Sequence, residues 1–191
     1  VDGYGREMER HREVSRVPGG GELERALDFA RAAGFTSEFV GDRKTDVLTQ
    51  IGALENLEDG LFLAKLRESP FYPAGGGQVS DQGYVVLDSD EATRAELVEA
   101  YRFDDDQALL FRGTGFSEGD RVRAVVPWSV RFPTMANHTG THLLHQALRD
   151  VLGEHVRQAG SAVRPDKLRF DFAHGQALTA TEREEIERRV N

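Results

Sequence analysis

Three histidines at helical spacing are the strongest candidates for functional residues in this 191-residue chain. They lie in the segment NHTGTHLLH at 137–145. On a helix of about 100° per residue, His138, His142 and His145 fall in one stripe. Two histidines four residues apart on a helix can bind one metal ion, because their ring nitrogens converge. The alternative is a row of hydrogen-bonded histidines at a contact between domains. The remaining circumference is apolar, and we expect burial of Leu143, Leu144, Ala147, Leu148 and Val151.

The composition excludes several classes of protein. The chain has no Cys, so it has neither a disulfide framework nor a thiolate metal site. No apolar run approaches membrane-spanning length and no signal peptide opens the chain, which predicts a cytoplasmic protein without a membrane partner. The chain lacks an initiator Met and stops just after a helix-like run, which predicts a fragment of something longer.

Charge is unevenly distributed along the chain. The net charge is -9, and residues 1–130 hold 15 Lys and Arg against 25 Asp and Glu. The remaining residues hold 9 against 8, with five of the six His. Phosphate attraction supplies most non-specific affinity for nucleic acids, so this balance argues against a general nucleic-acid binder. Any RNA contact must be local or must depend on other parts of a longer protein.

The first 127 residues predict a helical connector followed by a β region. Residues 4–16 and 22–33 have helical patterns, separated by Pro and Gly, and Gly34 is a stop signal. Short apolar segments between turn sequences then predict a small antiparallel sheet or barrel. The expected strands are at 36–40, 45–51, 60–67, 83–88, 98–103, 107–112 and 120–127.

A glycine-rich loop, PFYPAGGGQVSDQG at residues 70–83, interrupts the β region. Three consecutive Gly allow backbone conformations closed to other residues and let a ligand approach the main chain. The alternative is a tight loop anchored by its aromatic residues. It is not a phosphate-binding P-loop, since no Gly-Lys-Ser/Thr follows.

The last third predicts a compact helix–hairpin–helix unit after a junction at 127–135. Gly153 is expected to end the His-bearing helix, and Thr179-x-x-Glu182 is a capping box for the last one. The expected elements are a helix at 134–152, strands at 155–163 and 168–172, and a helix at 180–190. The predicted fold class is therefore α+β, in three parts: a helical connector at 1–35, a barrel-like subdomain at 36–127 and the helix–hairpin–helix unit at 128–191.

Several motifs, in this order, resemble the editing domain of alanyl-tRNA synthetases, which is shared with the free-standing alanyl-tRNA editing proteins. They are HTGTHLLH at 138–145, QAGS at 158–161 and LRFDF at 168–172. The glycine-rich loop matches the same domain, so the resemblance runs from about residue 36 to the end. Residues 1–35 would correspond to the tail of the tRNA-recognition region, and residues 128–191 to an editing core that is incomplete at its C-terminus.

The resemblance implies part of an enzyme that attaches alanine to tRNA(Ala) with ATP and Mg²⁺, in a core absent from this chain. The editing domain hydrolyses mischarged Ser-tRNA(Ala) and Gly-tRNA(Ala), because a pocket built for a methyl group cannot strongly exclude glycine or serine. The implied partners are the acceptor end of tRNA(Ala) and the remainder of the synthetase chain. No oligomeric state is implied.

The resemblance also assigns residues to an editing site. They are the zinc ligands His138 and His142, the active-site threonine Thr141, and Gln158, Ser161 and Gln78, which line the pocket. The family completes its zinc site with a downstream Cys-x-x-x-His segment, which this chain does not contain. Zinc needs about four ligands, so we expect the chain to bind zinc weakly or not at all, and to have little activity alone.

Two other classes of function remain open from the sequence. One is a non-catalytic tRNA-binding or interdomain module; the other is a metal-dependent hydrolase of other esters or peptides. The metalloprotease motif requires Glu where this chain has Thr139. Regular strand alternation would also send Gln158 and Ser161 to opposite faces. If both line one pocket, we expect an irregularity near Gly160.

Overall fold

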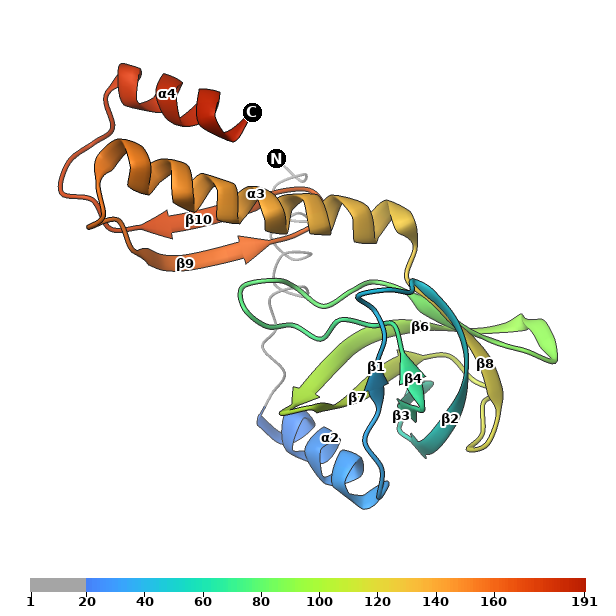
Figure 1. Ribbon diagram of the computed structural model, residues 1–191. Coiled ribbons are helices and arrows are strands. Elements are labelled where there is room, and N and C mark those ends of the chain that lie inside the picture. Colours follow the sequence, from blue (N-terminus) through green and yellow to red (C-terminus); the bar gives the residue numbers. More distant parts are fainter. Residues whose placement is uncertain (1–19) are drawn as a thin grey trace, which may run out of the picture.

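The structure, a computed structural model, describes residues 20–191 and confirms the α+β fold class (Figure 1). The predicted helix at 4–16 lies outside the described residues. The elements are α2 (Gly20–Ala32), β1 (Glu38–Phe39), β2 (Asp46–Asn56), β3 (Leu61–Leu66), β4 (Glu68–Ser69), β5 (Tyr84–Leu87), β6 (Asp90–Phe103), β7 (Asp106–Arg112), β8 (Arg121–Val125), α3 (Trp128–Leu152), β9 (Gln158–Val163), β10 (Leu168–Phe172) and α4 (Ala180–Val190). Within residues 20–191, no helix combines the length and the apolar character needed to cross a membrane.

Six antiparallel strands close into a barrel in the order β2-β3-β7-β6-β5-β8. Phenylalanines fill its interior: Phe62 stacks on Phe111 and on Phe116, each with ring centroids 5.5 Å apart. Phe71, from the glycine-rich loop, meets Phe111 edge to face at 5.8 Å. The loop is therefore anchored in the barrel core at its start. The expected strand at 36–40 is only the two-residue β1, which pairs in parallel with β4 outside the barrel.

Strand β3 is buried on both faces, and its residues are apolar except for Lys65. Phe62 points into the barrel core, whereas Leu63 belongs to a second cluster in which Ala26 and Phe29 of α2 pack on the outside of the barrel. Lys65 lies on the same outer face and is fully buried. Its ammonium group donates to the carbonyl of Ala30 at 3.1 Å, to the carbonyl of Phe35 and to Asp106 at 2.6 Å.

Replacing Lys65 by Met should lower the free energy of unfolding by about 2–4 kcal/mol, because two backbone carbonyls and one carboxylate lose a charged donor. The last turn of α2 should become the most exchangeable part of that helix. Hydrogen exchange and urea unfolding measure both effects. The same change at the exposed Lys44, which is 3.4 Å from Glu68, is the control and should cost less than about 1 kcal/mol. Equal losses for the two variants would contradict the anchoring role of Lys65.

Helix α3 begins at Trp128, so the predicted junction at 127–135 and the predicted start at 134 are wrong. The error came from Pro133, which lies inside the helix and cannot donate the bond to the carbonyl four residues earlier. Such a proline costs about 3 kcal/mol in a helix interior. Tertiary contacts of the neighbouring Arg131, which is buried, oppose that cost.

The C-terminal half of α3 lies between α4 and the β9–β10 hairpin (Figure 1). Ala147 and Leu148 are buried there with Val156 and Ile186, and Leu144 and Val151 pack against this cluster. Leu143 is 50% exposed, so its predicted burial is wrong.

The structure also confirms two predicted helix ends in the second half of the chain. Gly153 is the C-cap of α3, and α4 spans the predicted residues behind the capping box of Thr179 and Glu182. The backbone N–H and then the hydroxyl of Thr179 lower the pKa of Glu182.

Candidate functional site

The glycine-rich loop crosses from the barrel to the hairpin and attaches to the outer edge of β9 (Figure 1). The Val163 amide donates to the carbonyl of Gly77 at 2.8 Å, and the Val79 amide donates to the carbonyl of Val163 at 3.2 Å. Within the loop, Gly75 and Gln78 exchange two backbone hydrogen bonds, of 3.0 and 2.9 Å. The main chain on both sides of Gln78 is thereby fixed.

Gly77 is the position where this docking demands glycine. Its φ of +85° lies in the region that other residues avoid. A Cβ atom there would also lie 3.0 Å from the carbonyl oxygen of Ser161 and far inside contact distance of its hydroxyl. The glycine thus lets the loop backbone lie directly against a predicted site residue.

Gln78 reaches from the loop to the His stripe of α3. Its Oε1 is 2.7 Å from Nδ1 of His138. The ring of His142 lies beside that of His138, with centroids 5.1 Å apart. The structure therefore brings both predicted ligands and Gln78 together, although the loop and the helix are 60 residues apart in the sequence.

Strand β9 is irregular, as predicted, with the irregularity one residue before Gly160. Asp171 pairs with Gly160, but Phe172 pairs with Gln158, so Ala159 has no partner in the ladder. The extra residue places the side chains of Gln158 and Ser161 together, and Nε2 of Gln158 donates to Oγ of Ser161 at 3.0 Å. Ser161 in turn faces Gly77. Both predicted strand residues thus lie on the loop side of the hairpin.

Thr141 and His145 are placed differently from His138 and His142. Thr141 is buried, and its hydroxyl donates to the carbonyl of Asn137 at 2.8 Å, within α3. No hydrogen bond among the described residues joins it to Gln158 or Ser161. His145 packs its ring against Phe170, with centroids 5.1 Å apart, and its Nε2 is buried. His145 therefore belongs to the hairpin contact rather than to the His138–His142 pair.

A buried ion pair that the sequence did not indicate fixes α3 to the glycine-rich loop. Nη2 of Arg131 lies 2.6 Å from Oδ2 of Asp81, and their side chains are 6% and 1% exposed. The Arg131 guanidinium also donates to the carbonyls of Gly41 and Pro70, and the amide of Tyr72 donates to Asp81 at 2.7 Å. In the sequence, the only indication of this ion pair is the position of Asp81 at the end of the glycine-rich loop. Its partner, Arg131, lies in the proline-containing first turns of α3.

His155 and His174 form a second pair that the sequence did not indicate. Nε2 of His155 lies 2.9 Å from Nδ1 of His174, and the rings are stacked. This pair lies at the ends of the hairpin and shares no hydrogen bond with the His138–His142 pair in the described part of the chain.

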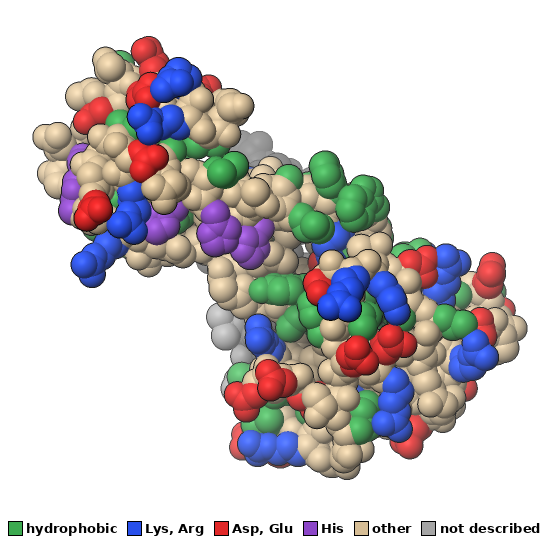
Figure 2. All heavy atoms as spheres, in the orientation of Figure 1, with side chains coloured by type: hydrophobic (Ala, Val, Ile, Leu, Met, Phe, Trp, Pro, Cys, Tyr) green, Lys and Arg blue, Asp and Glu red, His purple; other side chains and the backbone are tan. Residues whose placement is uncertain are grey.

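The described residues contain no cluster of three or more His, Cys, Asp or Glu side chains arranged to hold a metal. The predicted zinc site consequently has two donors, His138 and His142. Figure 2 shows His side chains gathered on this face beside a hydrophobic patch. Three large apolar side chains in the first turns of α3 are exposed, Trp128, Phe132 and Met135.

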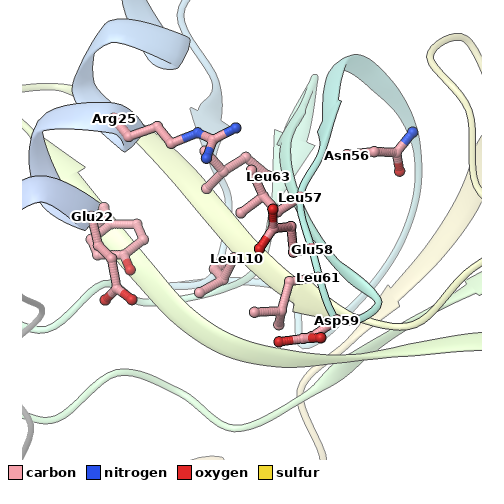
Figure 3. Close-up of a pocket in the computed structure, with 10 residues that line it drawn as sticks. Glu22, Arg25, Asn56, Leu57, Glu58, Asp59, Leu61, Leu63 and Leu110 are labelled. Atoms are coloured by element: carbon pink, nitrogen blue, oxygen red, sulfur yellow. The ribbon is translucent and has the colours of Figure 1, made fainter.

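A hollow of about 600 Å³ lies elsewhere, between α2 and the turn after β2 (Figure 3). Glu22 and Arg25 approach it from α2, and Glu58 and Asp59 from the turn, with Leu61 and Leu110 in its floor. Tyr101 also lines it, and burial raises the pKa of this phenol to about 12. None of the predicted site residues lines this hollow.

Known proteins resemble the chain along nearly its whole length. No protein-family model matches it, but curated alanine–tRNA ligases do. The enzyme of Oceanobacillus iheyensis is 38% identical over 205 residues, covering 99% of this chain and 23% of the relative. That of Rubrobacter xylanophilus is 43% identical over 185 residues, covering 94% and 20%. That of Halalkalibacterium halodurans is 35% identical, covering 100% and 23%. The chain is therefore similar along nearly its whole length to a segment of alanine–tRNA ligases, and it spans about a fifth of the length of the relatives it matches.

Proposed function

We propose that this chain is the editing portion of a protein that attaches alanine to tRNA(Ala) with ATP and Mg²⁺. Its reaction would be hydrolysis of the ester that joins serine or glycine to tRNA(Ala). The observation that carries the proposal is the meeting of three segments: His138 on α3, Gln78 on the glycine-rich loop, and Ser161 on β9 beside that loop. All three are residues that the family resemblance assigns to the editing site.

Ester hydrolysis needs a positioned water molecule and stabilisation of the oxyanion that develops on the carbonyl. Neither Gln158 nor Thr141 is a general base at neutral pH, since an amide and a hydroxyl do not accept a proton there. The Gln158 amide and the Ser161 hydroxyl, 3.0 Å apart, are suited to orienting water and to hydrogen bonding with the hydroxyl of a seryl group. A site that offers such bonds distinguishes serine from alanine far better than a methyl-sized pocket does.

Zinc is the metal we propose for the His138–His142 pair. Imidazole suits zinc, and when bound the ion would supply Lewis-acid chemistry or hold the substrate amine. Two donors are fewer than the about four that hold zinc firmly. We therefore expect the 191-residue chain alone to bind zinc weakly and to have little editing activity.

Replacing His142 by Ala in a full-length alanine–tRNA ligase that contains this segment tests the proposal. Deacylation of Ser-tRNA(Ala) should fall at least about 100-fold, since even residues that only support a metal ligand cost 10–100-fold when changed. Alanylation of tRNA(Ala) should stay unchanged, because it belongs to a separate active site.

The same change at the exposed His155 is the matched control and should leave deacylation within about twofold, since it removes an imidazole outside the His138–His142 pair. Unchanged deacylation in the His142→Ala variant would contradict the editing site and favour a non-catalytic tRNA-binding module.

A further inference from the structure

We propose that Gln78 is a positioning residue that holds the proton of His138 on Nδ1 and leaves Nε2 free to face the site. Treating this free nitrogen as a metal ligand rests on the proposed function. The placement of the proton itself rests only on the contact between the two side chains.

The chemistry of the two groups fixes the direction of this hydrogen bond. A neutral imidazole carries one N–H donor and one unprotonated acceptor nitrogen, whereas the oxygen of an amide only accepts. Oε1 of Gln78 lies 2.7 Å from Nδ1 of His138, so Nδ1 must donate. Nε2 then carries the lone pair, and this is the nitrogen state that binds a metal.

The acceptor is held rigidly enough to select one form of the ring. The backbone of Gln78 is bonded to Gly75 on one side, and its neighbours Gly77 and Val79 are bonded to Val163 of β9. The side chain therefore starts from a fixed main chain and crosses a short gap to α3. A hydrogen bond from a fixed acceptor biases both the tautomer and the orientation of an imidazole.

The two histidines of the pair are consequently unequal. His142 is exposed, and no hydrogen bond within residues 20–191 orients its ring. His138 is half-buried and oriented. Gln78 of the glycine-rich loop thus orients one ring of the pair, and no such contact orients the other.

Nitrogen-15 NMR of the labelled 191-residue chain tests this directly, without metal or tRNA. At about pH 8.5 an imidazole is neutral, and two-bond proton–nitrogen correlations report which ring nitrogen is protonated. We expect His138 to be mainly in the Nδ1–H form. Gln78→Leu should remove this preference, whereas Gln78→Glu, which keeps an acceptor at the same reach, should retain it. Gln82→Leu, an exposed glutamine of the same loop, is the matched control and should leave the tautomer unchanged.

A His138 ring mainly in the Nε2–H form, or a Gln78→Leu variant with an unaltered tautomer, would overturn the proposal. Amide spectra of Val79 and Val163 identify any variant in which the loop has left β9. Gln78→Glu then decides the matter, because it keeps an acceptor oxygen at the same place: loss of the Nδ1–H form in that variant with the loop still on β9 would overturn the proposal. These outcomes are independent of the editing reaction. If His142→Ala left deacylation unchanged, the tautomer of His138 would still be as measured. If His138 had the other tautomer, the His142→Ala experiment would still test the editing function.

Discussion

Replacing Arg131 by Met should lower the free energy of unfolding by about 3–5 kcal/mol, the cost of leaving one partner of a buried ion pair uncompensated. The Asp81 side chain, which is 1% exposed, would lose its cationic partner and keep only the Tyr72 amide as a described donor. The carbonyls of Gly41 and Pro70 would each lose a charged donor. Urea unfolding followed by circular dichroism measures the loss.

Two further variants separate the buried charge from the rest of the substitution. The double variant Arg131→Met with Asp81→Asn should recover at least about 1 kcal/mol, because no charge then remains buried without its partner. Arg123→Met breaks an ion pair with Asp46 whose side chains are 61% and 44% exposed, and it should cost less than about 1 kcal/mol. A cost for Arg131→Met no larger than that of Arg123→Met would show that the buried pair does not hold α3 to the loop.

Replacing Gly77 by Ala should detach the glycine-rich loop from β9. The added methyl group would collide with the Ser161 hydroxyl, and its residue would have to keep a φ of +85°. Backbone strain of this kind costs about 1–3 kcal/mol, and the collision with Ser161 adds to it. We expect the Val163 amide, which donates to Gly77, to lose its protection from hydrogen exchange. Ser-tRNA(Ala) deacylation in the full-length ligase should fall about 100-fold as Gln78 leaves His138.

Gly76→Ala is the matched control, because Gly76 also has a positive φ, of +59°, but no atom lies within 4 Å of its added methyl group. It should cost about 1 kcal/mol from strain alone and leave Val163 protected. If Gly76→Ala and Gly77→Ala expose Val163 equally, strain rather than contact with Ser161 controls the docking of the loop.

Local patterns predicted the elements whose signals lie within a few residues. The capping box of Thr179 and Glu182 and the alternating LRFDF segment gave α4 and β10 with the bounds that the structure has. The first half of β6 was missed because its sequence, DEATRAEL, is polar and mostly exposed. Its place in the sheet depends on pairing with β5 and β7, which no local pattern encodes.

Long-range contacts explain the rest of what the sequence did not predict. Pro133 predicts a helix boundary locally, and only the partners of Arg131, which lie 50 to 90 residues earlier, favour the helix around it. Within the candidate site, the four-residue spacing of His138 and His142 was enough to predict that they share one face of a helix. The irregularity beside Gly160 followed from requiring Gln158 and Ser161 to share a side. The contact of Gln78 with His138 spans 60 residues and has no local signature.

The docking of the glycine-rich loop also has a consequence for aggregation. A closed barrel has no free strand edge, but the two-stranded β9–β10 hairpin does, and an open edge offers unpaired main-chain groups to other chains. Residues 77–79 occupy the edge of β9 with bonds to both main-chain groups of Val163. The loop that brings Gln78 to His138 therefore also covers the exposed edge of β9. A variant in which the loop leaves β9 should self-associate and should also lose the contact between Gln78 and His138.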